Sequence, residues 1–386
     1  MGNRVRKKLN WKILLIEIVA IVVLIAITLK LVEYWTGVNP IDNLFQRKNA
    51  LSDISEVASV LTEALDQGKD EEMVVYIKDI PEQDLQNINY IMSNLNGSVD
   101  SFQIHPKIFG VRRVSFKIVR SDNSYVYDAY KNGTSIPEDR KEAQKLLVRV
   151  NRILEDQISP VMSDYQKELA LHDYLLKHCI YGHGSEETEY EYRAYGALVE
   201  GQAVCNGYAE AMALLLSCAG VENRYVVGTA NSGSRSVQQT APDNARPENH
   251  AWNLVRVNGT WYHLDSTWDD PVGEKELVSH AYFNVSDEVL RRDHSWNEEK
   301  YEDCPDMSWN YYYREHIFFE RGSAMSDYLK QKLAIHPYGT VECAFGSFEM
   351  TDTMLSGLGA IPGISKLYYS TVGDFHYAVL TIYIEQ

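Results

Sequence analysis

The sequence predicts an α+β fold in which a helix that begins at a cysteine packs against an antiparallel sheet. Two observations predict this core: an apolar helical run follows Cys205, and two β-patterned runs meet at Asn258-Gly259. A third observation, the apolar run over residues 13–35, adds one N-terminal transmembrane helix. Small α/β regions flank the core on both sides.

The N-terminal run has the length and the flanks of a membrane anchor. About 20 apolar residues span a bilayer, and no convincing small-x-small cleavage site follows, so we expect a retained anchor rather than a cleaved signal. Trp11, Tyr34 and Trp35 stand where interface aromatics are found. The basic tail over residues 1–12 contains no acid, which predicts a cytoplasmic N-terminus and an extracytoplasmic chain from residue 36 onward.

The composition disfavours some partners and leaves the cysteine chemistry open. The net charge is 37 − 54 = −17, and removing the five basic residues of the tail leaves −17 − 5 = −22 for the remainder. Such a balance does not favour nucleic acid or an anionic surface as a partner. Five cysteines without a C-x-x-C pair predict no zinc site. They are compatible with one free thiol and up to two disulfides, or with five reduced thiols.

The flanking regions alternate helix and strand patterns and contain no catalytic constellation. Residues 36–69 are expected to form a stalk with one helix. Residues 70–135 and 311–386 are two small α/β regions of similar order. Their expected elements are a strand over 73–77, a helix over 81–97 and strands over 112–119 and 124–130, then a strand over 341–345, a helix over 349–359 and strands over 366–370 and 377–386. We expect packing or partner recognition from both regions.

Residues 139–310 are expected to form the catalytic domain, which begins with two helices on either side of Pro160. His172, His178 and His183 fall near the end of the second helix. Residues six apart on a helix do not share a face. We therefore interpret these histidines as ordinary polar positions rather than as a metal site.

Asp265, Asp269, Asp270 and Glu274 form an acidic cluster further along. The cluster lacks the loop spacing of a calcium site such as the EF-hand. Asp269-Asp270-Pro271 reads better as the turn that leaves the sheet. No metal and no other cofactor is expected.

Cys205 opens the apolar helical run, which ends at Gly220, a good C-terminal stop. A helix of this composition is buried. A thiol in the first turn of a helix faces the positive end of the helix dipole, which favours the thiolate. A free cysteine is also among the most buried and inert residue types, so Cys205 alone does not decide between the two interpretations.

The hairpin brings a histidine and an aspartate together. Asn258-Gly259 predicts a two-residue type I′ loop. Counting back from that loop pairs Val257 with Thr260, Val255 with Tyr262, Trp252 with Asp265 and His250 with Thr267. His250 and Asp265 then become diagonal neighbours on one face of the ribbon, about 7–8 Å apart at Cα. An imidazole can donate to the carboxylate from there while its other nitrogen faces Cys205.

Three blocks of sequence, GQAVCNGYAEAMALLL, NHAWNLVRVNGTWYHLDSTWDDP and YFNVSDEVLRRDHSW, resemble the bacterial transglutaminase-like family. The resemblance extends from near Tyr165 to near Asn297. It implies a papain-like/transglutaminase-like core and a thiol enzyme that acts on protein or peptide amides through a thioester. By this resemblance Cys205 is the nucleophile, His250 the base and Asp265 the group that orients the base.

Other residues near these blocks are candidates for supporting roles. The backbone N–H of Cys205 is one candidate oxyanion donor, and the side chain of Gln202 is a candidate for the second. Trp252 shares the predicted hairpin face with His250 and Asp265, and so does Trp261. His263 and Trp268 are candidates for contact with the catalytic groups rather than with substrate. The polar segment over residues 230–248 is expected to rim the cleft as a mobile loop.

The sequence leaves the acyl acceptor open. Water as acceptor makes a peptidase or amidase, and an amine such as lysine makes a cross-linking acyltransferase. A protein that kept this fold as a binding or structural module without activity is the competing class. Substrate identity and oligomeric state are beyond the sequence.

Overall fold

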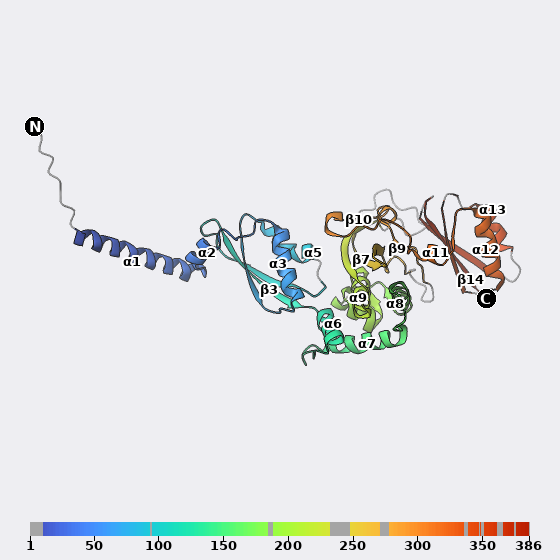
Figure 1. Ribbon diagram of the computed structural model, residues 1–386, viewed down its shortest axis with the longest axis horizontal. Helices are drawn as coiled ribbons and strands as arrows, with labels where there is room; N and C mark the ends of the chain where they lie inside the picture. Colours follow the sequence, from blue (N-terminus) through green and yellow to red (C-terminus); the bar gives the residue numbers. More distant parts are fainter. Residues whose placement is uncertain are drawn as a thin grey trace, which may run out of the picture. The chain divides into compact units, whose positions relative to one another are not determined.

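The computed structural model describes residues 11–92, 95–183, 188–231, 248–270, 278–335, 339–346, 348, 351–360, 366–373 and 376–385. They divide into two compact units, Met1–Ser121 and Asp122–Gln386 (Figure 1). Both units mix helices with sheets, which confirms the predicted α+β class. Most of the loop expected over residues 230–248 lies outside the described residues.

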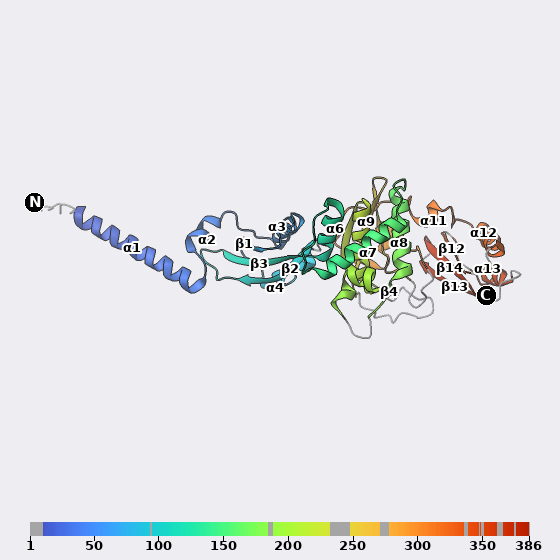
Figure 2. The same ribbon diagram turned by 90° about the horizontal axis from the view of Figure 1, so that it is seen from below.

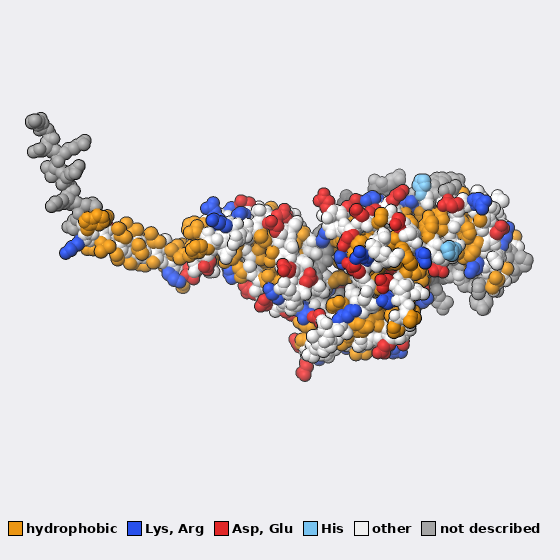
Figure 3. Space-filling view, in the orientation of Figure 1, with side chains coloured by type: hydrophobic (Ala, Val, Ile, Leu, Met, Phe, Trp, Pro, Cys, Tyr) orange, Lys and Arg blue, Asp and Glu red, His pale blue; other side chains and the backbone are white. Residues whose placement is uncertain are grey.

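Helix α1 (Trp11–Thr36) is the one described helix long and apolar enough to cross a membrane. None of its residues is buried, and hydrophobic side chains cover the face of α1 that Figure 3 shows. A helix that is apolar all round is stable only when buried in protein or in lipid. The short helix α2 (Pro40–Gln46) follows, capped by the Asn39 side chain.

Helix α3 (Ile54–Asp66) packs on a three-stranded sheet of order β1-β3-β2 in the first unit (Figure 2). Val57, Leu61 and Leu65 of α3 share a buried core with Phe116 of β3. The interpretation of residues 36–69 as a stalk is therefore wrong for this helix. Its apolar face belongs to the sheet that follows. The strands are β1 (Glu72–Ile77), β2 (Gly97–Ile104) and β3 (Arg112–Arg120).

Two elements of this unit differ from the prediction. The helix expected over 81–97 is two short helices, α4 (Glu82–Gln86) and α5 (Ile88–Met92). Gly97 then begins β2, which was not predicted because its sequence GSVDSFQI is largely polar. A methyl group at Gly97 would lie 2.3 Å from the carbonyl oxygen of Val119, so the close approach of β2 and β3 requires glycine here.

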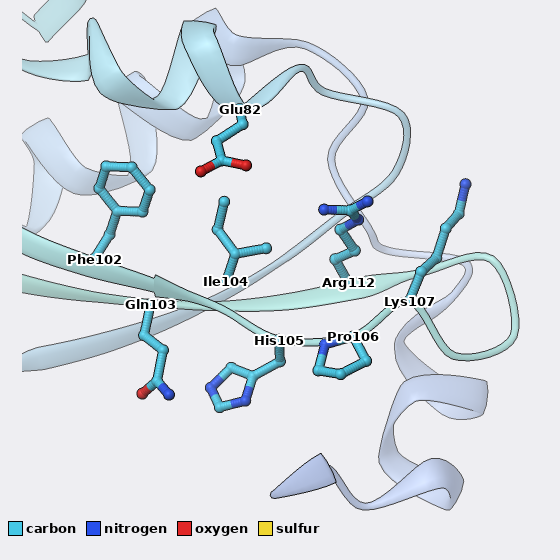
Figure 4. Close-up of a pocket in the computed structure, with 8 residues that line it drawn as sticks. All are labelled: Glu82, Phe102, Gln103, Ile104, His105, Pro106, Lys107 and Arg112. Atoms are coloured by element: carbon cyan, nitrogen blue, oxygen red, sulfur yellow. The ribbon is translucent and has the colours of Figure 1, made fainter.

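An open pocket lies beside the end of β2 in this unit (Figure 4). Glu82 and Arg112 lie on one side of the strand with Phe102 and Ile104, while His105 projects on the other. Its lining includes no cysteine, serine or threonine; the lining residues are Glu82, Phe102, Gln103, Ile104, His105, Pro106, Lys107 and Arg112. The pocket therefore offers no hydroxyl or thiol nucleophile.

The second unit begins with helices. Residues 124–130 were predicted as a strand but lie within α6 (Asp122–Asn132). The mixed apolar and polar residues of this short run also suit a helix, and Val126 is buried in the core. Helices α7 (Lys141–Gln157), α8 (Asp164–His178) and α9 (Cys205–Ala219) confirm the predicted helices. Shorter elements between them are β4 (Ile180–Tyr181), η1 (Glu189–Tyr192), η2 (Gly196–Glu200) and β5 (Gln202–Ala203).

Helix α9 packs against a five-stranded sheet of order β10-β6-β7-β8-β9. Every pairing in this sheet is antiparallel. The core that α9 shares with the sheet includes Val255, Tyr262 and Leu264. The strands are β6 (Asn223–Ala230), β7 (Glu248–Val257), β8 (Thr260–Leu264), β9 (Phe283–Val285) and β10 (His294–Trp296). A cysteine helix against an antiparallel sheet is the predicted core.

A second sheet, of order β11-β12-β14-β13, forms the C-terminal part of this unit. Val379 of β14 and Tyr377, which directly precedes this strand, share a buried cluster with Trp252 and Leu290 of the central part. The two sheets are therefore connected through a common core. The elements are α10 (Asp287–Leu290), η4 (Glu298–Lys300), α11 (Tyr311–Arg314), β11 (Phe318–Phe319), α12 (Gly322–Ile335), β12 (Gly339–Phe345), α13 (Asp352–Gly359), β13 (Lys366–Gly373) and β14 (Ala378–Glu385).

Candidate active site

Cys205 is the first residue of α9 and is buried. The residue before it, Val204, has no side-chain oxygen to cap the helix, so the first-turn N–H groups are not satisfied by that side chain. Gly207 lets this turn pack closely, because a methyl group there would lie 2.6 Å from the Glu191 carbonyl oxygen. The local sequence thus directs the positive end of a helix dipole toward the thiol.

His250 lies on β7 and binds Asp265. Its Nε2 is 2.7 Å from Oδ2 of Asp265. Cys205 also interacts with the imidazole. Because Nε2 is occupied by Asp265, Nδ1 is the ring nitrogen left for the thiol. The three residues that the sequence singled out therefore lie together.

The pairing that led to this expectation is correct only in part. Asn258 and Gly259 both have positive φ, 51° and 89°, as a type I′ loop requires. Val257 pairs with Thr260 and Val255 with Tyr262, as predicted.

The ladder ends at Asn253 and Leu264, so the predicted pairs of Trp252 with Asp265 and of His250 with Thr267 do not form. The chain leaves β8 at Asp265 in a turn, because Oδ1 of Asp265 accepts the backbone N–H groups of Thr267 and Trp268 at 3.0 and 3.1 Å. His250 instead pairs with Gly228 on β6.

His250 and Asp265 each stabilise the charged form of the other. Burial alone would lower the pKa of His250, but the charge and hydrogen bond of Asp265 and the contact with Cys205 raise it to about 9. Burial would likewise raise the pKa of Asp265, but His250 and His294 hold it well below its usual range. At neutral pH the ring is therefore an imidazolium that interacts with the Asp265 carboxylate and with the Cys205 sulfur.

His294 is a member of this site that the sequence analysis did not single out. It lies on β10, and its Nε2 is 3.0 Å from the same Oδ2 of Asp265 that His250 contacts. Its Nδ1 is 2.5 Å from Oδ1 of Asp293. The block YFNVSDEVLRRDHSW contains His294, so the signal was present. No spacing argument connects β10 to the hairpin, because β6 separates them in the sheet.

Aromatic rings surround the histidine. The ring of Trp252 is stacked at 5.9 Å from that of His250, and Trp268 lies at 5.8 Å from the same ring. Trp252 also donates from Nε1 to Nδ1 of His263 over 3.0 Å, and His263 donates from Nε2 to Oδ1 of Asp287 over 2.9 Å. These contacts exclude water from the His–Asp pair, which strengthens its electrostatic interaction.

Other candidates have less defined positions. Gln202 is half-buried on β5, three residues before Cys205, the first residue of α9. Trp261 lies under the guanidinium of Arg224, 4.8 Å from it, rather than against His250.

All five cysteines are free and buried. Burial raises the pKa of the Cys179 and Cys218 thiols to about 12, and it raises those of Cys304 and Cys343 as well.

The three histidines near the end of α8 do not share one environment. His172 is buried and contacts Asp173 and Asp269 at 3.2 Å each, so its interpretation as an ordinary polar position is wrong. His178 contacts the carbonyl oxygen of Tyr174, and His183 contacts Glu191. The acidic residues Asp269 and Asp270 are buried too. Asp270 accepts a hydrogen bond from the Tyr208 hydroxyl.

Comparison with known proteins identifies the family of this region. Residues 151–266 match the model of the transglutaminase-like superfamily. No curated protein matches the sequence. Several solved structures, including the following three, are similar at low identity. A crystal structure described as a TGase has 15% identity and a TM-score of 0.27, covering 55% of this chain and 55% of that chain.

A proposed cysteine protease from Cytophaga hutchinsonii has 14% identity and a TM-score of 0.25, covering 51% of this chain and 65% of its own. The periplasmic domain of TgpA from Pseudomonas aeruginosa, bound to ethylmercury, has 14% identity and a TM-score of 0.22, covering 51% of this chain and 72% of its own. This chain thus spans 55% and 65% of the first two structures.

The family match includes the N-terminus of α9, the hairpin and the turn after it. Cys205, His250 and Asp265 all lie within the matched residues. The similarity to the transglutaminase-like superfamily therefore extends over the part of the chain that contains the three candidate residues.

Proposed function

We propose that this chain is a membrane-anchored thiol enzyme that cleaves protein or peptide amides through a Cys205–His250–Asp265 triad. The observation that carries the proposal is the 2.7 Å contact between His250 Nε2 and the buried Asp265, together with the interaction of Cys205 with the same imidazole. A carboxylate that fixes one imidazole nitrogen leaves the other directed at the nucleophile.

The first half-reaction begins at the Cys205 sulfur, which attacks the amide carbonyl carbon. A C–S bond forms, and the carbonyl oxygen becomes an oxyanion. The C–N bond then breaks as the His250 imidazolium gives its proton to the leaving amine, which yields a thioester and a free amine. The backbone N–H of Cys205 is the first proposed oxyanion donor, and the Gln202 side chain the second.

The second half-reaction consumes the thioester. His250, now neutral, takes a proton from the acceptor, which attacks the thioester carbonyl and releases the Cys205 sulfur. Water as acceptor gives a carboxylic acid, and a primary amine gives a new amide. Both outcomes use the same triad, so the accessibility of the acceptor to the thioester determines which product forms.

The membrane part of the proposal rests on α1. The helix is apolar, exposed along its length and preceded by a basic segment. We propose that it anchors the chain with residues 1–12 in the cytoplasm and the enzyme domain outside.

The test uses the full-length chain in detergent with a glutamine-containing peptide and a labelled primary amine. Incorporation of the label identifies an acyltransferase, and glutamate or a shortened peptide without label identifies a hydrolase. Cys205→Ala should abolish either product, whereas Cys218→Ala, at the other end of the same helix, should not. Absence of product from the unmodified chain across a panel of amide substrates supports a binding module without activity.

A further inference from the structure

A second buried cluster of histidines and carboxylates lies outside the active site. Its members are His172 and Asp173 on α8, His280 in the segment before β9, Asp269 after the hairpin and Glu342 on β12. We name it the α8 cluster. It joins the helical part, the central sheet and the C-terminal sheet of the second unit. The proposed acyl-transfer reaction does not use any of these side chains.

Two histidine nitrogens converge on one carboxylate oxygen in this cluster. His172 Nδ1 is 3.2 Å and His280 Nε2 is 3.0 Å from Oδ1 of Asp173. The three ligand atoms all lie within 4.8 Å of one another. Ligand atoms of one cation with metal–ligand bonds of about 2.0–2.2 Å lie roughly 3–4 Å apart, and the two measured distances to Asp173 fall in this range.

Each histidine uses its other nitrogen on a separate carboxylate. His172 Nε2 is 3.2 Å from Oδ2 of Asp269, and His280 Nδ1 is 2.8 Å from Oε2 of Glu342. Further donors hold both carboxylates. Asp269 accepts the Tyr282 backbone N–H at 2.7 Å, and Glu342 accepts the hydroxyl groups of Tyr312 and Thr381. Metal-binding histidines characteristically donate their second N–H to a carboxylate in this way.

Hydrogen-bond complementarity requires either a metal cation or additional protons at the centre. A neutral imidazole has one N–H and one lone pair. If each ring donates to Asp269 or Glu342, both remaining lone pairs face an Asp173 oxygen, which can only accept. One divalent cation placed among the three atoms removes this conflict at both rings. Two additional protons are the other way to remove it.

His263 provides the contrast within the same fold. It too lies beside a carboxylate and a cysteine, Asp287 and Cys304. Its Nδ1 accepts the Trp252 N–H and its Nε2 donates to Asp287, so both nitrogens have complementary partners. No lone pair of that ring is left for a metal ion.

We propose that His172 Nδ1, His280 Nε2 and the Asp173 carboxylate bind a divalent transition-metal ion such as Zn²⁺. Imidazole and carboxylate are ligands that Zn²⁺ accepts, and water would complete four-coordination. The Asp173 side chain is 29% exposed, which gives the ion and its water access to solvent. Asp269 and Glu342 orient the two imidazoles.

Such an ion would stabilise the contact between α8 and the C-terminal sheet. His280 reaches β12 through Glu342, and its ring stacks at 3.7 Å on Tyr311. Asp269 also donates its backbone N–H to the carbonyl oxygen of Asp265 over 3.1 Å, so the cluster supports the turn that carries the active-site aspartate. The role is structural rather than catalytic.

The test is Zn²⁺ binding to the full-length chain in detergent, without an affinity tag and after treatment with a chelator. The chain carries Cys205→Ala so that the active-site thiol does not bind the metal. Calorimetric titration with ZnCl₂ should give one ion per chain with a Kd below about 1 μM, and the Tm should rise as the site fills. Elemental analysis of the dialysed complex checks the stoichiometry.

Asp173→Asn should weaken binding at least a hundredfold, and so should His280→Gln. The matched control is His178→Ala, which removes an exposed histidine from the same helix and should leave the Kd unchanged. Two results would overturn the proposal: no stoichiometric Zn²⁺ binding to the parent chain, or binding that survives Asp173→Asn and is lost with His250→Ala. The first result would mean that protons occupy the cluster, and the second would place the ion at the active site.

Discussion

His294 donates from Nε2 to Oδ2 of Asp265 over 3.0 Å, on the oxygen that also accepts the His250 Nε2–H. The other oxygen of Asp265 accepts two backbone N–H groups from the turn that follows. The carboxylate is therefore fixed from both sides and cannot rotate without losing hydrogen bonds. We interpret His294 as a positioning residue for the pair of Asp265 and His250.

Replacing His294 with alanine should lower kcat by roughly 10- to 100-fold with little change in KM. A hydrogen bond to a charged group contributes about 1.5–3 kcal/mol, and about 1.4 kcal/mol corresponds to a factor of ten in rate. His294→Gln, which retains a donor, should recover part of the loss. Steady-state kinetics on the amide substrate of the proposed reaction check this. An effect on KM alone would contradict a positioning role.

Cys205 should be alkylated faster than any other cysteine of the chain. Cys205 interacts with the His250 imidazole and lies at the N-terminus of α9, whereas burial raises the pKa of the other four thiols. At pH 6 iodoacetamide should modify Cys205 at least tenfold faster, as read by mass spectrometry of tryptic peptides. His250→Ala should remove the advantage. Equal rates at all five cysteines would show that the triad is not assembled.

The stability that His250 contributes should depend on pH in a defined direction. Its pKa rises from an ordinary 6.5 to about 9 in the folded chain, so the folded state binds the proton more tightly. The stabilisation is complete below about pH 6.5 and is lost as pH rises through about 9. The difference in Tm between the unmodified chain and His250→Gln should therefore be largest at pH 6 and smallest at pH 9.5. A difference that grows with pH would contradict the assignment.

The stability of the folded chain should also fall as pH rises because of the buried acid Glu168. It lies fully buried on α8, accepts a hydrogen bond from Asn284 over 2.9 Å, and burial raises its pKa from 4.5 to about 8. Between those values the unfolded carboxyl is ionised and the folded one is protonated, so stability falls as pH rises, by at most about 1.4 kcal/mol per unit.

Glu168→Gln should therefore gain stability relative to the unmodified chain from about pH 4.5 to 8. Thermal unfolding at half-unit steps measures the difference. Glu155→Gln, at an exposed position on α7, is the matched control and should show no such trend. If Glu168→Gln loses stability at pH 8, the buried carboxyl is ionised there and its second oxygen has a cationic partner.

The membrane orientation is testable with single cysteines. Asn49→Cys lies after α1 at an exposed position, and Asn3→Cys lies in the basic tail. In spheroplasts a membrane-impermeant maleimide should label Asn49→Cys directly and Asn3→Cys only after permeabilisation. The reverse pattern would place the enzyme domain in the cytoplasm and contradict the proposed orientation. The unmodified chain controls for labelling of the native cysteines.

Local sequence rules were reliable where one element decides its own structure. The helix that begins at Cys205 and its glycine stop at Gly220 appear where the pattern predicted them. The Asn258-Gly259 loop set the register of its nearest pairs. The same rules failed over residues 124–130, because an alternating apolar pattern over so few residues fits a strand or a helix, and packing against neighbouring helices decided for the helix.

The sequence by itself determined the α+β class, the membrane-length helix and the thiol, imidazole and carboxylate of the site, because periodicity, turn chemistry and motif order are local properties. Only the tertiary structure decided which partners those residues meet. His294 reaches Asp265 through the order of strands in the sheet. His280 contacts Asp173, which lies 107 positions earlier in the sequence. Contacts of that range depend on chain topology and burial, which no local pattern contains.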